Sequence, residues 1–156
     1  MATLDVVAVK LAGLGSRLDV GTERLVRVLV LAIDRNLVLG SAVDTGRFRS
    51  NWMVRIGAPW RRVIAPYSPL PRGKDPSKFG EQANAARAMA SASARIAPYK
   101  GRKQVWISNN VVYAYRLTHK SHSLQMPGGR NWLLPRVTAG VLEARRAAGD
   151  VLKLGP

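Results

Sequence analysis

Hydrophobic and polar positions divide the N-terminal part of the chain into two segments with helical periodicity. Apolar residues recur three and four positions apart from Leu4 to Leu18, which predicts a helical arm within residues 1–20. A longer helix is predicted from Thr22 to Leu39, with Thr22 as the N-cap and Glu23 placed favourably for the helix dipole. Gly40 follows as a typical helix stop.

Two apolar residues of the longer helix fall within its charged sector. At about 100° per residue, Leu31 and Val38 share one side of the helix with its charged residues, Glu23, Arg24, Arg27, Asp34 and Arg35. One interpretation is that Leu31 and Val38 contact another subunit. The other is that they are scattered apolar surface residues, which are common and need no special explanation.

The middle of the chain contains two segments with the period-two alternation of strands. Residues 52–57 and 104–108 alternate apolar and polar side chains and are rich in β-branched and aromatic types. We predict that they are neighbours in one antiparallel sheet. The segment between them, residues 58–80, contains five prolines and several basic residues, which predicts a long loop, with a short strand possible at residues 61–65.

Two further helices complete the predicted secondary structure. Residues 81–97 are rich in alanine and other good helix formers and end before Pro98. A last helix is predicted from Trp132 to about Leu152, with Pro135 in its first turn and four apolar residues on one side, Leu134, Val137, Val141 and Leu142. The fold class is therefore α+β, a single domain over residues 1–156 with a small antiparallel sheet packed against helices and with long basic loops.

Charge is the most unusual feature of the composition. The 156 residues carry a formal net charge of +16, and residues 41–120 contain fifteen basic but only three acidic side chains. Such a chain is expected to bind acidic partners. It contains no cysteine, which excludes disulfides and thiolate chemistry, and we find no signal peptide or membrane span in the sequence.

Candidate catalytic groups are sparse. His119 and His122 are three residues apart, but no Asp or Glu between Glu81 and Glu143 completes a metal site, so a loop or partner-facing role is the better interpretation. Asp44, Asp75 and Glu81 stand where caps are expected. We therefore expect no enzyme activity, no metal and no cofactor.

Two segments carry a resemblance to a known family. They are Val43-Asp44-Thr45-Gly46-Arg47-Phe48-Arg49-Ser50-Asn51-Trp52 and Asn109-Asn110-Val111-Val112-Tyr113-Ala114-Tyr115-Arg116-Leu117, followed by a polar loop over residues 121–129. In this order the chain resembles the small tail-component or neck proteins, involved in tail completion and head–tail joining, of tailed bacteriophages with long non-contractile tails. The likeness spans residues 32–140. The chain departs from the family at Thr118-His119-Lys120, where relatives have Glu-Tyr-Gly, and its Pro-rich segment 58–80 resembles an insertion.

The resemblance implies a non-catalytic virion protein that forms a homo-oligomeric ring between the head–tail connector and the tail. Its partners would be further copies of itself and the neighbouring connector or stopper, tail terminator or tail tube proteins, with DNA in the channel as a further possible partner and no membrane. The implied location is the neck or tail of the virion, made in the bacterial cytoplasm. The motif residues implied to maintain the fold are Asp44, Thr45, Gly46, Arg47, Trp52, Asn110, Tyr113 and Leu117.

Physical roles and assembly surfaces can be assigned to these segments. Asp44 is expected to cap the turn and pair with Arg47, Gly46 to adopt positive φ, and Trp52 to anchor a strand in the core. The loops at residues 58–80 and 121–129 are the expected assembly surfaces. With the two helix residues, the expected interface comprises Leu31, Val38, Arg61, Arg62, Arg72, Lys74, Lys78, His119, Lys120, His122, Gln125 and Pro127.

Two other functional classes remain open. A stand-alone nucleic-acid-binding protein would also be strongly basic, and Trp60, Tyr67 and Tyr99 could stack on bases, although no known binding motif is present. An enzyme with a buried site is the third hypothesis, and the scarce acids and missing cysteines argue against it.

Overall fold

The structure is a computed structural model, and it describes residues 7–11, 20–41, 46–69, 78–101, 103–120 and 132–153. The fold is α+β: helices pack against a small antiparallel sheet, as the alternating and helical patterns predicted.

The sheet has three strands in the order β1-β3-β2. Strand β3 (Val105–Asn109) lies in the centre and pairs antiparallel with both β1 (Val7–Leu11) and β2 (Met53–Ile56). In the register, Ile107 stands opposite Val54 on one side and Val9 on the other. The pairing of the two predicted middle strands is therefore confirmed, with their bounds shifted by one residue.

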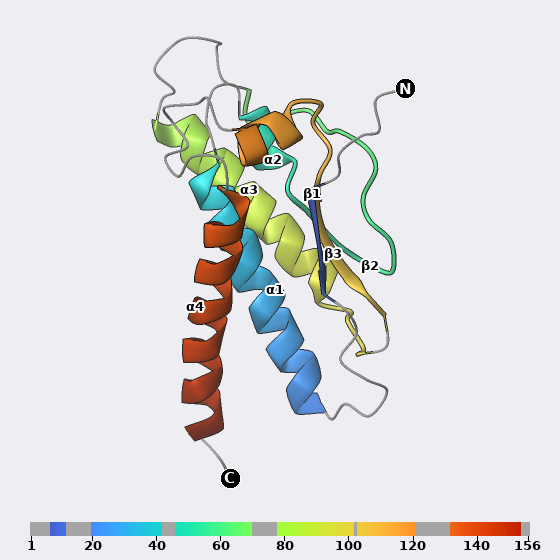
Figure 1. Ribbon diagram of the computed structural model, residues 1–156, viewed down its shortest axis with the longest axis vertical. Coiled ribbons are helices and arrows are strands. Elements are labelled where there is room, and N and C mark those ends of the chain that lie inside the picture. The colour runs from blue at the N-terminus through green and yellow to red at the C-terminus, as the bar shows by residue number, and fades with distance from the viewer. Residues whose placement is uncertain are drawn as a thin grey trace.

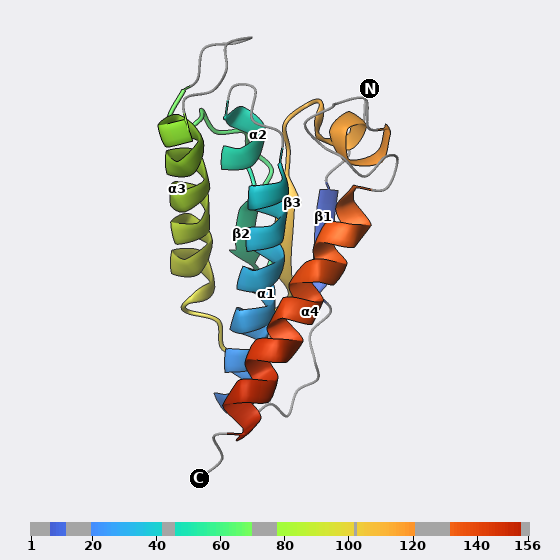
Figure 2. The same ribbon diagram turned by 90° about the vertical axis from the view of Figure 1, so that its left-hand side faces the viewer.

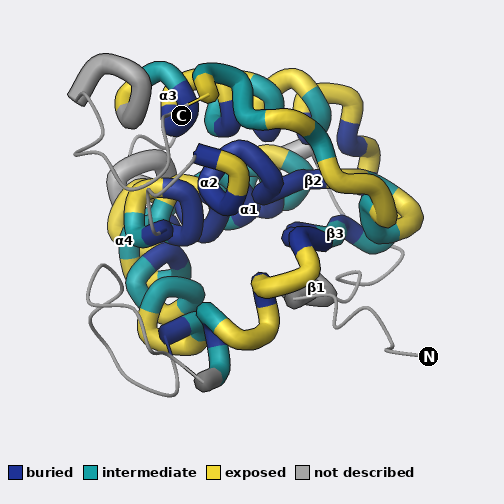
Figure 3. The backbone as a smooth tube through the Cα atoms, turned by 90° about the horizontal axis from the view of Figure 1, so that it is seen from above, coloured by how far each residue is buried: buried dark blue, intermediate teal, exposed yellow. Residues whose placement is uncertain are grey.

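Helix α1 (Val20–Gly40) is the central helix of the molecule. Figure 2 shows it between α3 (Lys78–Ile96) and α4 (Leu133–Lys153), and Figure 1 shows the sheet on the far side of α1 from α4. A short helix, α2 (Arg47–Ser50), precedes β2, and a π-helical turn, η1 (Arg116–Lys120), follows β3. Viewed from above in Figure 3, the buried positions gather where α1 meets the strands and the neighbouring helices.

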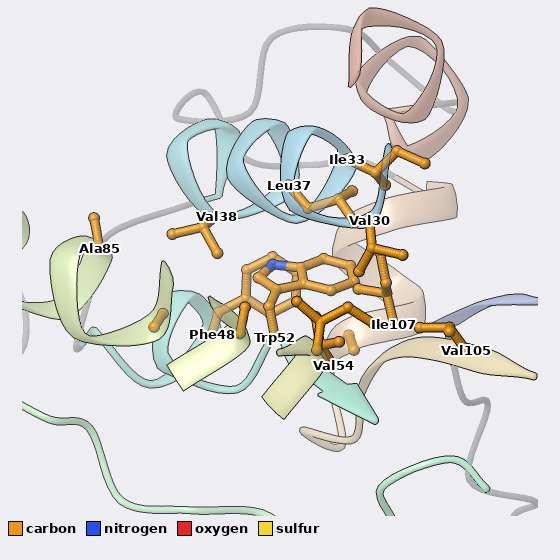
Figure 4. Close-up of a cluster of buried hydrophobic side chains, with 14 of the residues drawn as sticks. Val30, Ile33, Leu37, Val38, Phe48, Trp52, Val54, Ala85, Val105 and Ile107 are labelled. Carbon is orange, nitrogen blue, oxygen red and sulfur yellow. The ribbon is translucent and has the colours of Figure 1, made fainter. Parts of the chain in front are cut away.

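The core is organised around Trp52. Its indole lies between the apolar side of α1, represented by Val30 and Leu37, and the strand residues Val54 and Ile107 (Figure 4). Trp52 also stacks on Trp132 with ring centroids 6.3 Å apart. Because an aromatic residue of this size buries a large apolar area, Trp52 joins three layers of the fold in one contact cluster.

A glycine allows α4 to approach α1 closely. A Cβ at Gly140 would lie 2.5 Å from the Cα of Ile33 and 2.9 Å from the carbonyl oxygen of Ala32. These are backbone atoms, which cannot turn away as a flexible side chain would. Gly140 is therefore required by the packing of the two helices rather than by its own conformation.

The predicted N-terminal helical arm is wrong for residues 7–11. These residues form β1, an edge strand paired with β3, and residues 12–18 lie outside the described residues. The segment Val7-Ala8-Val9-Lys10-Leu11 also has period-two spacing, and its β-branched residues favour extended backbone. Pairing with β3 thus overrides the three-and-four spacing of the leucines.

The interpretation of Leu31 and Val38 as subunit contacts is not supported by their positions. Val38 is 0% exposed and belongs to the core, and Leu31 is partly buried against the same core. Asp34, from the same predicted charged sector, is also buried. The prediction failed because α1 is covered by other elements on more sides than a surface helix would be.

The other helices match their predictions in type, with differences at their ends. Helix α1 begins at Val20, so Thr22 lies within its first turn rather than at the N-cap, and α3 begins at Lys78, three residues before the predicted start. In α4, Val137 and Val141 pack on the core, whereas Leu134 is 67% exposed and Leu142 is 46% exposed. Residues 61–65 form no strand.

Candidate functional site: an anchored basic loop

The loop that follows β2 is held against the body of the protein by buried side-chain amides. We call its described part, residues 58–69, the anchored loop. Asn51 donates from Nδ2 to the Ile64 carbonyl (3.0 Å) and accepts the Ile64 N–H at Oδ1 (2.8 Å), as a paired strand would. The same Nδ2 also donates to the Arg47 carbonyl in α2. One buried side chain therefore connects the loop to α2.

Asn84 of α3 forms the second anchor. Its Oδ1 accepts the Ser68 N–H (2.7 Å) and the Ser50 hydroxyl (2.9 Å), and its Nδ2 donates to the Ser68 carbonyl (2.7 Å). Ser50 in turn accepts the Tyr67 N–H. Asn84 is 0% exposed, so these hydrogen bonds satisfy a carboxamide that would otherwise be buried at a cost.

Gly46 makes room for this anchor. It has φ +73°, which confirms the predicted positive φ, and a Cβ at this position would lie 2.3 Å from Asn84 Nδ2. Any side chain here would be strained by the backbone and would also displace Asn84. The glycine therefore serves the contact between α2 and α3.

The third anchor holds the start of the loop. The carbonyl of Trp60 accepts hydrogen bonds from Asn110 Nδ2 and, at 3.4 Å, from the Ser108 hydroxyl. Figure 1 shows the loop returning along the side of the sheet that faces away from the helices. Because the loop covers this side, Met53 and Ser108 are buried although they lie opposite the core face.

The two segments that carry the family resemblance meet in space. Asn109 Nδ2 donates to the Phe48 carbonyl (2.8 Å), and the Phe48 ring lies 6.2 Å from that of Tyr113. Residues from both segments, Asn51 and Asn110, also hold the anchored loop. The segments therefore form one structural unit although about 60 residues separate them along the chain.

This unit also terminates α1. Arg49 Nη2 donates to the carbonyls of Leu39 (3.2 Å) and Ser41 (3.0 Å), and Trp52 Nε1 donates to the Ser41 hydroxyl (2.7 Å). Carbonyls at a helix end lack intrahelical partners, and a guanidinium there also complements the helix dipole. Arg49 and Trp52 of the first motif thus fix the end of the central helix.

The anchored loop presents arginines to solvent. Arg61 and Arg62 are exposed, and the ring of Trp60 beside them carries two guanidinium groups, Arg55 with Cζ 5.6 Å and Arg95 with Cζ 5.0 Å from the ring centroid. We call Arg55, Arg61, Arg62 and Arg95 the basic face. These groups come from β2, the loop and α3, so the tertiary fold gathers them.

The predicted site residues fall into three groups. Trp52, Asn110 and Leu117 are buried or partly buried, as expected of residues that maintain the fold, whereas Tyr113 and Tyr115 are exposed. His119 lies in η1, where it stacks on Tyr115 and its Nδ1 is 2.8 Å from the Thr118 hydroxyl. Lys78 begins α3 and Lys120 ends η1. The predicted residues outside the described residues are Asp44, Thr45, Arg72, Lys74, His122, Gln125 and Pro127.

Sequence reasoning named Asn110 among the residues that maintain the fold but missed Asn51 and Asn84, the other two anchors of the loop. The role of Asn84 could have been predicted, because asparagine is a poor helix former and its presence in an alanine-rich helix indicates a specific contact. Ser50 and Asn51 were inside a recognised motif, but nothing in the sequence indicated that their partners are Ile64, Tyr67 and Ser68. Arg49 was part of the same motif, and nothing in the sequence indicated that it caps a helix.

The carboxyl of Asp34 lies in the interior of the protein. Asp34 is 1% exposed, its Oδ1 has no hydrogen-bond partner, and burial raises the pKa of its carboxyl well above the ordinary value. It lies in α1, within the core and away from the arginines of the basic face. Elsewhere in the described residues, no group of three or more His, Asp and Glu side chains is arranged to hold a metal ion.

Comparison of the chain with protein-family models, with curated proteins and with solved structures found no match. Within the described parts of the chain, no helix combines the length and apolar character needed to cross a membrane.

Proposed function

We propose that this chain is a non-catalytic structural subunit of a tailed bacteriophage, a neck or tail-completion protein that forms a ring between the connector and the tail. Its contacts with neighbouring subunits involve the anchored loop. The observation that carries the proposal is that both segments of the family resemblance converge on this loop and hold it in one conformation.

Anchoring suits a loop that serves assembly. A loop ordered only on docking would lose conformational entropy at that moment, which weakens association. Here Asn51, Asn84 and Asn110 order the loop within the single chain, through hydrogen bonds that contribute about 0.5–1.5 kcal/mol each. The exposed part of the loop is thus presented in advance to a neighbouring subunit.

Part of the nucleic-acid-binding alternative depended on base stacking. Tyr99 is 2% exposed and Tyr67 is partly buried against the core, so neither ring is fully open to a base. Trp60 is partly buried and carries guanidinium groups. These positions argue against recognition of single strands by stacking, and they leave charge as the remaining basis for nucleic-acid binding.

The proposal is tested in a phage that encodes this chain. Deletion of the gene is expected to leave filled heads and finished tails unjoined in electron micrographs, and the wild-type gene supplied in trans restores joined particles. The charge reversal Arg61→Glu with Arg62→Glu is expected to restore far fewer. Cryo-electron microscopy of the virion should place a ring of this chain at the head–tail joint. Normal particles from the deletion strain, with no copy of the chain in the virion, would reject the proposal.

A further inference from the structure

Acidic side chains are absent from two long stretches of the chain, whereas basic side chains occur throughout it. Residues 45–74 and 82–142 contain no Asp or Glu, and these ranges include the described part of the loop, β2, β3, η1 and nearly all of α3. The ion pairs of the described residues are Arg27–Glu23 (3.6 Å) and Arg35–Glu143 (3.3 Å), which lie on α1 and α4. The sheet and loop side therefore carries positive charge that its own segments cannot neutralise.

The basic face concentrates this charge. Arg55 and Arg95, from two different elements, are both brought to the indole of Trp60. Lys103 adds to the charge, because its Cδ would lie 4.0 Å from a Cβ at Gly57, directly after β2. The ring attracts each guanidinium but carries no net charge, so the face keeps its positive charge and attracts anions.

The lack of opposite charges on this face favours one class of polyanion. Protein interfaces usually mix both signs of charge, because opposite pairs fix the register and exclude wrong partners. A surface with only positive charges does not fix the register of a partner in this way. Such a surface suits a partner whose negative charge repeats uniformly along its length. Arginine also matches phosphate oxygens with two parallel N–H donors.

We propose that the basic face, Arg55, Arg61, Arg62 and Arg95, binds the phosphate backbone of duplex DNA without regard to base sequence. Tyr99 is buried, Tyr67 is partly buried against the core, and Trp60 carries guanidinium groups, so recognition rests on phosphate contacts. This inference goes beyond the proposed function and holds without it, because it depends only on the arrangement of charge.

The test compares two variants with the same change in net charge. Arg61→Gln with Arg62→Gln removes two cations from the basic face, and Arg145→Gln with Arg146→Gln removes two exposed cations from α4. Binding of the full chain to a random-sequence 20-base-pair duplex is measured by fluorescence anisotropy over a series of salt concentrations, with circular dichroism to confirm that each variant is folded.

The loop variant is expected to lower the slope of log K against log salt by about 1.8, which is two phosphate contacts. Its affinity should fall on the order of 10- to 100-fold at 0.1 M salt, whereas the α4 variant should change the slope by much less. Duplexes rich in A·T and in G·C should bind equally. A smaller single substitution, Arg62→Gln, should lower the slope by about half as much.

Three results would overturn the inference. Equal losses in the two double variants would mean that net charge alone attracts DNA. Much tighter binding of a single strand than of a duplex would mean that bases are contacted. Binding of poly-glutamate that exceeds DNA binding and depends more on Arg61 and Arg62 would assign the face to an acidic protein. The measurement uses no phage particle. A negative DNA-binding result would therefore not contradict the proposed role in the neck, and rejection of that role would not change the DNA-binding result.

Discussion

Replacement of Asn84 by alanine should release one end of the anchored loop. The change removes three hydrogen bonds, two to the backbone of Ser68 and one to the hydroxyl of Ser50. Each contributes about 0.5–1.5 kcal/mol, and a partner left buried and unsatisfied costs about 1–3 kcal/mol. Alanine is the better helix former by up to about 0.7 kcal/mol, which offsets part of the loss. We expect the free energy of unfolding to fall by about 2–3 kcal/mol.

Two measurements separate local release of the loop from global loss of stability. In urea, with a slope of about 2 kcal/mol per molar, the unfolding midpoint should fall by about 1–1.5 M. Limited chymotrypsin digestion, followed by mass spectrometry, reports cleavage after Tyr67, whose bond to Ser68 lies in the segment that Asn84 holds. An opening made easier by about 2 kcal/mol should increase this cleavage about 30-fold.

The matched control is Gln82→Ala, an exposed position two residues earlier on the same helix. It should change the free energy of unfolding by less than about 0.5 kcal/mol and leave cleavage in the loop unchanged. If Asn84→Ala behaves like this control in both measurements, the hydrogen bonds of Asn84 do not hold the loop and the reasoning is refuted.

Further predictions concern the core and the helix ends. Burial raises the pKa of Asp34, so the folded chain binds the proton of this carboxyl more tightly than the unfolded chain does. The contribution of Asp34 to the free energy of unfolding should therefore be largest below about pH 4 and fall as pH rises through the folded pKa. Asp34→Asn should remove that fall in urea midpoints measured from pH 4 to 8, and an unchanged profile would contradict the assignment. Gly140→Ala should destabilise by about 1–3 kcal/mol because the Cβ meets the backbone of Ile33, whereas Gly149→Ala, with nothing within 4 Å, should stabilise by up to about 1 kcal/mol; thermal melts that rank the two the other way would refute the close approach. Arg49→Met should cost about 2–3 kcal/mol by urea titration, since two carbonyls at the end of α1 lose a charged donor, and a loss under about 0.5 kcal/mol would show that the cap is dispensable.

Local patterns were sufficient to predict most elements of this fold. The alternation in residues 52–57 and 104–108 located two strands and their pairing, because each strand buries one side against helices. The alanine-rich segment predicted α3, whose small residues Ala85, Ala88 and Ala92 lie in the core. Where local preference and tertiary packing agree, the sequence alone is informative.

The failures share a physical cause. Val7–Leu11 satisfies two periodicities, and only the presence of β3 as a partner decides between them. Val38 was interpreted as a surface residue because its helical neighbours are charged. Arg24 and Arg35 are indeed exposed, but Asp34 is buried beside Val38, so only part of the charged sector faces solvent. The anchors of the loop depend on long-range contacts, from Asn84 to Ser68 and from Asn110 to Trp60. The sequence around each of these residues does not indicate which residue it contacts.

The position of β3 between β1 and β2 constrains how the chain can fold while it is being synthesised. Neither Val7–Leu11 nor Met53–Ile56 has a strand to pair with until Val105–Asn109 has been made. At about 5–20 residues per second, the roughly 50 residues from β2 to β3 take about 3–10 seconds. Throughout this interval two apolar, unpaired strands could pair with those of another nascent chain. The sheet therefore depends on the late arrival of its central strand, and crowded translation of this gene is where misassembly should first be seen.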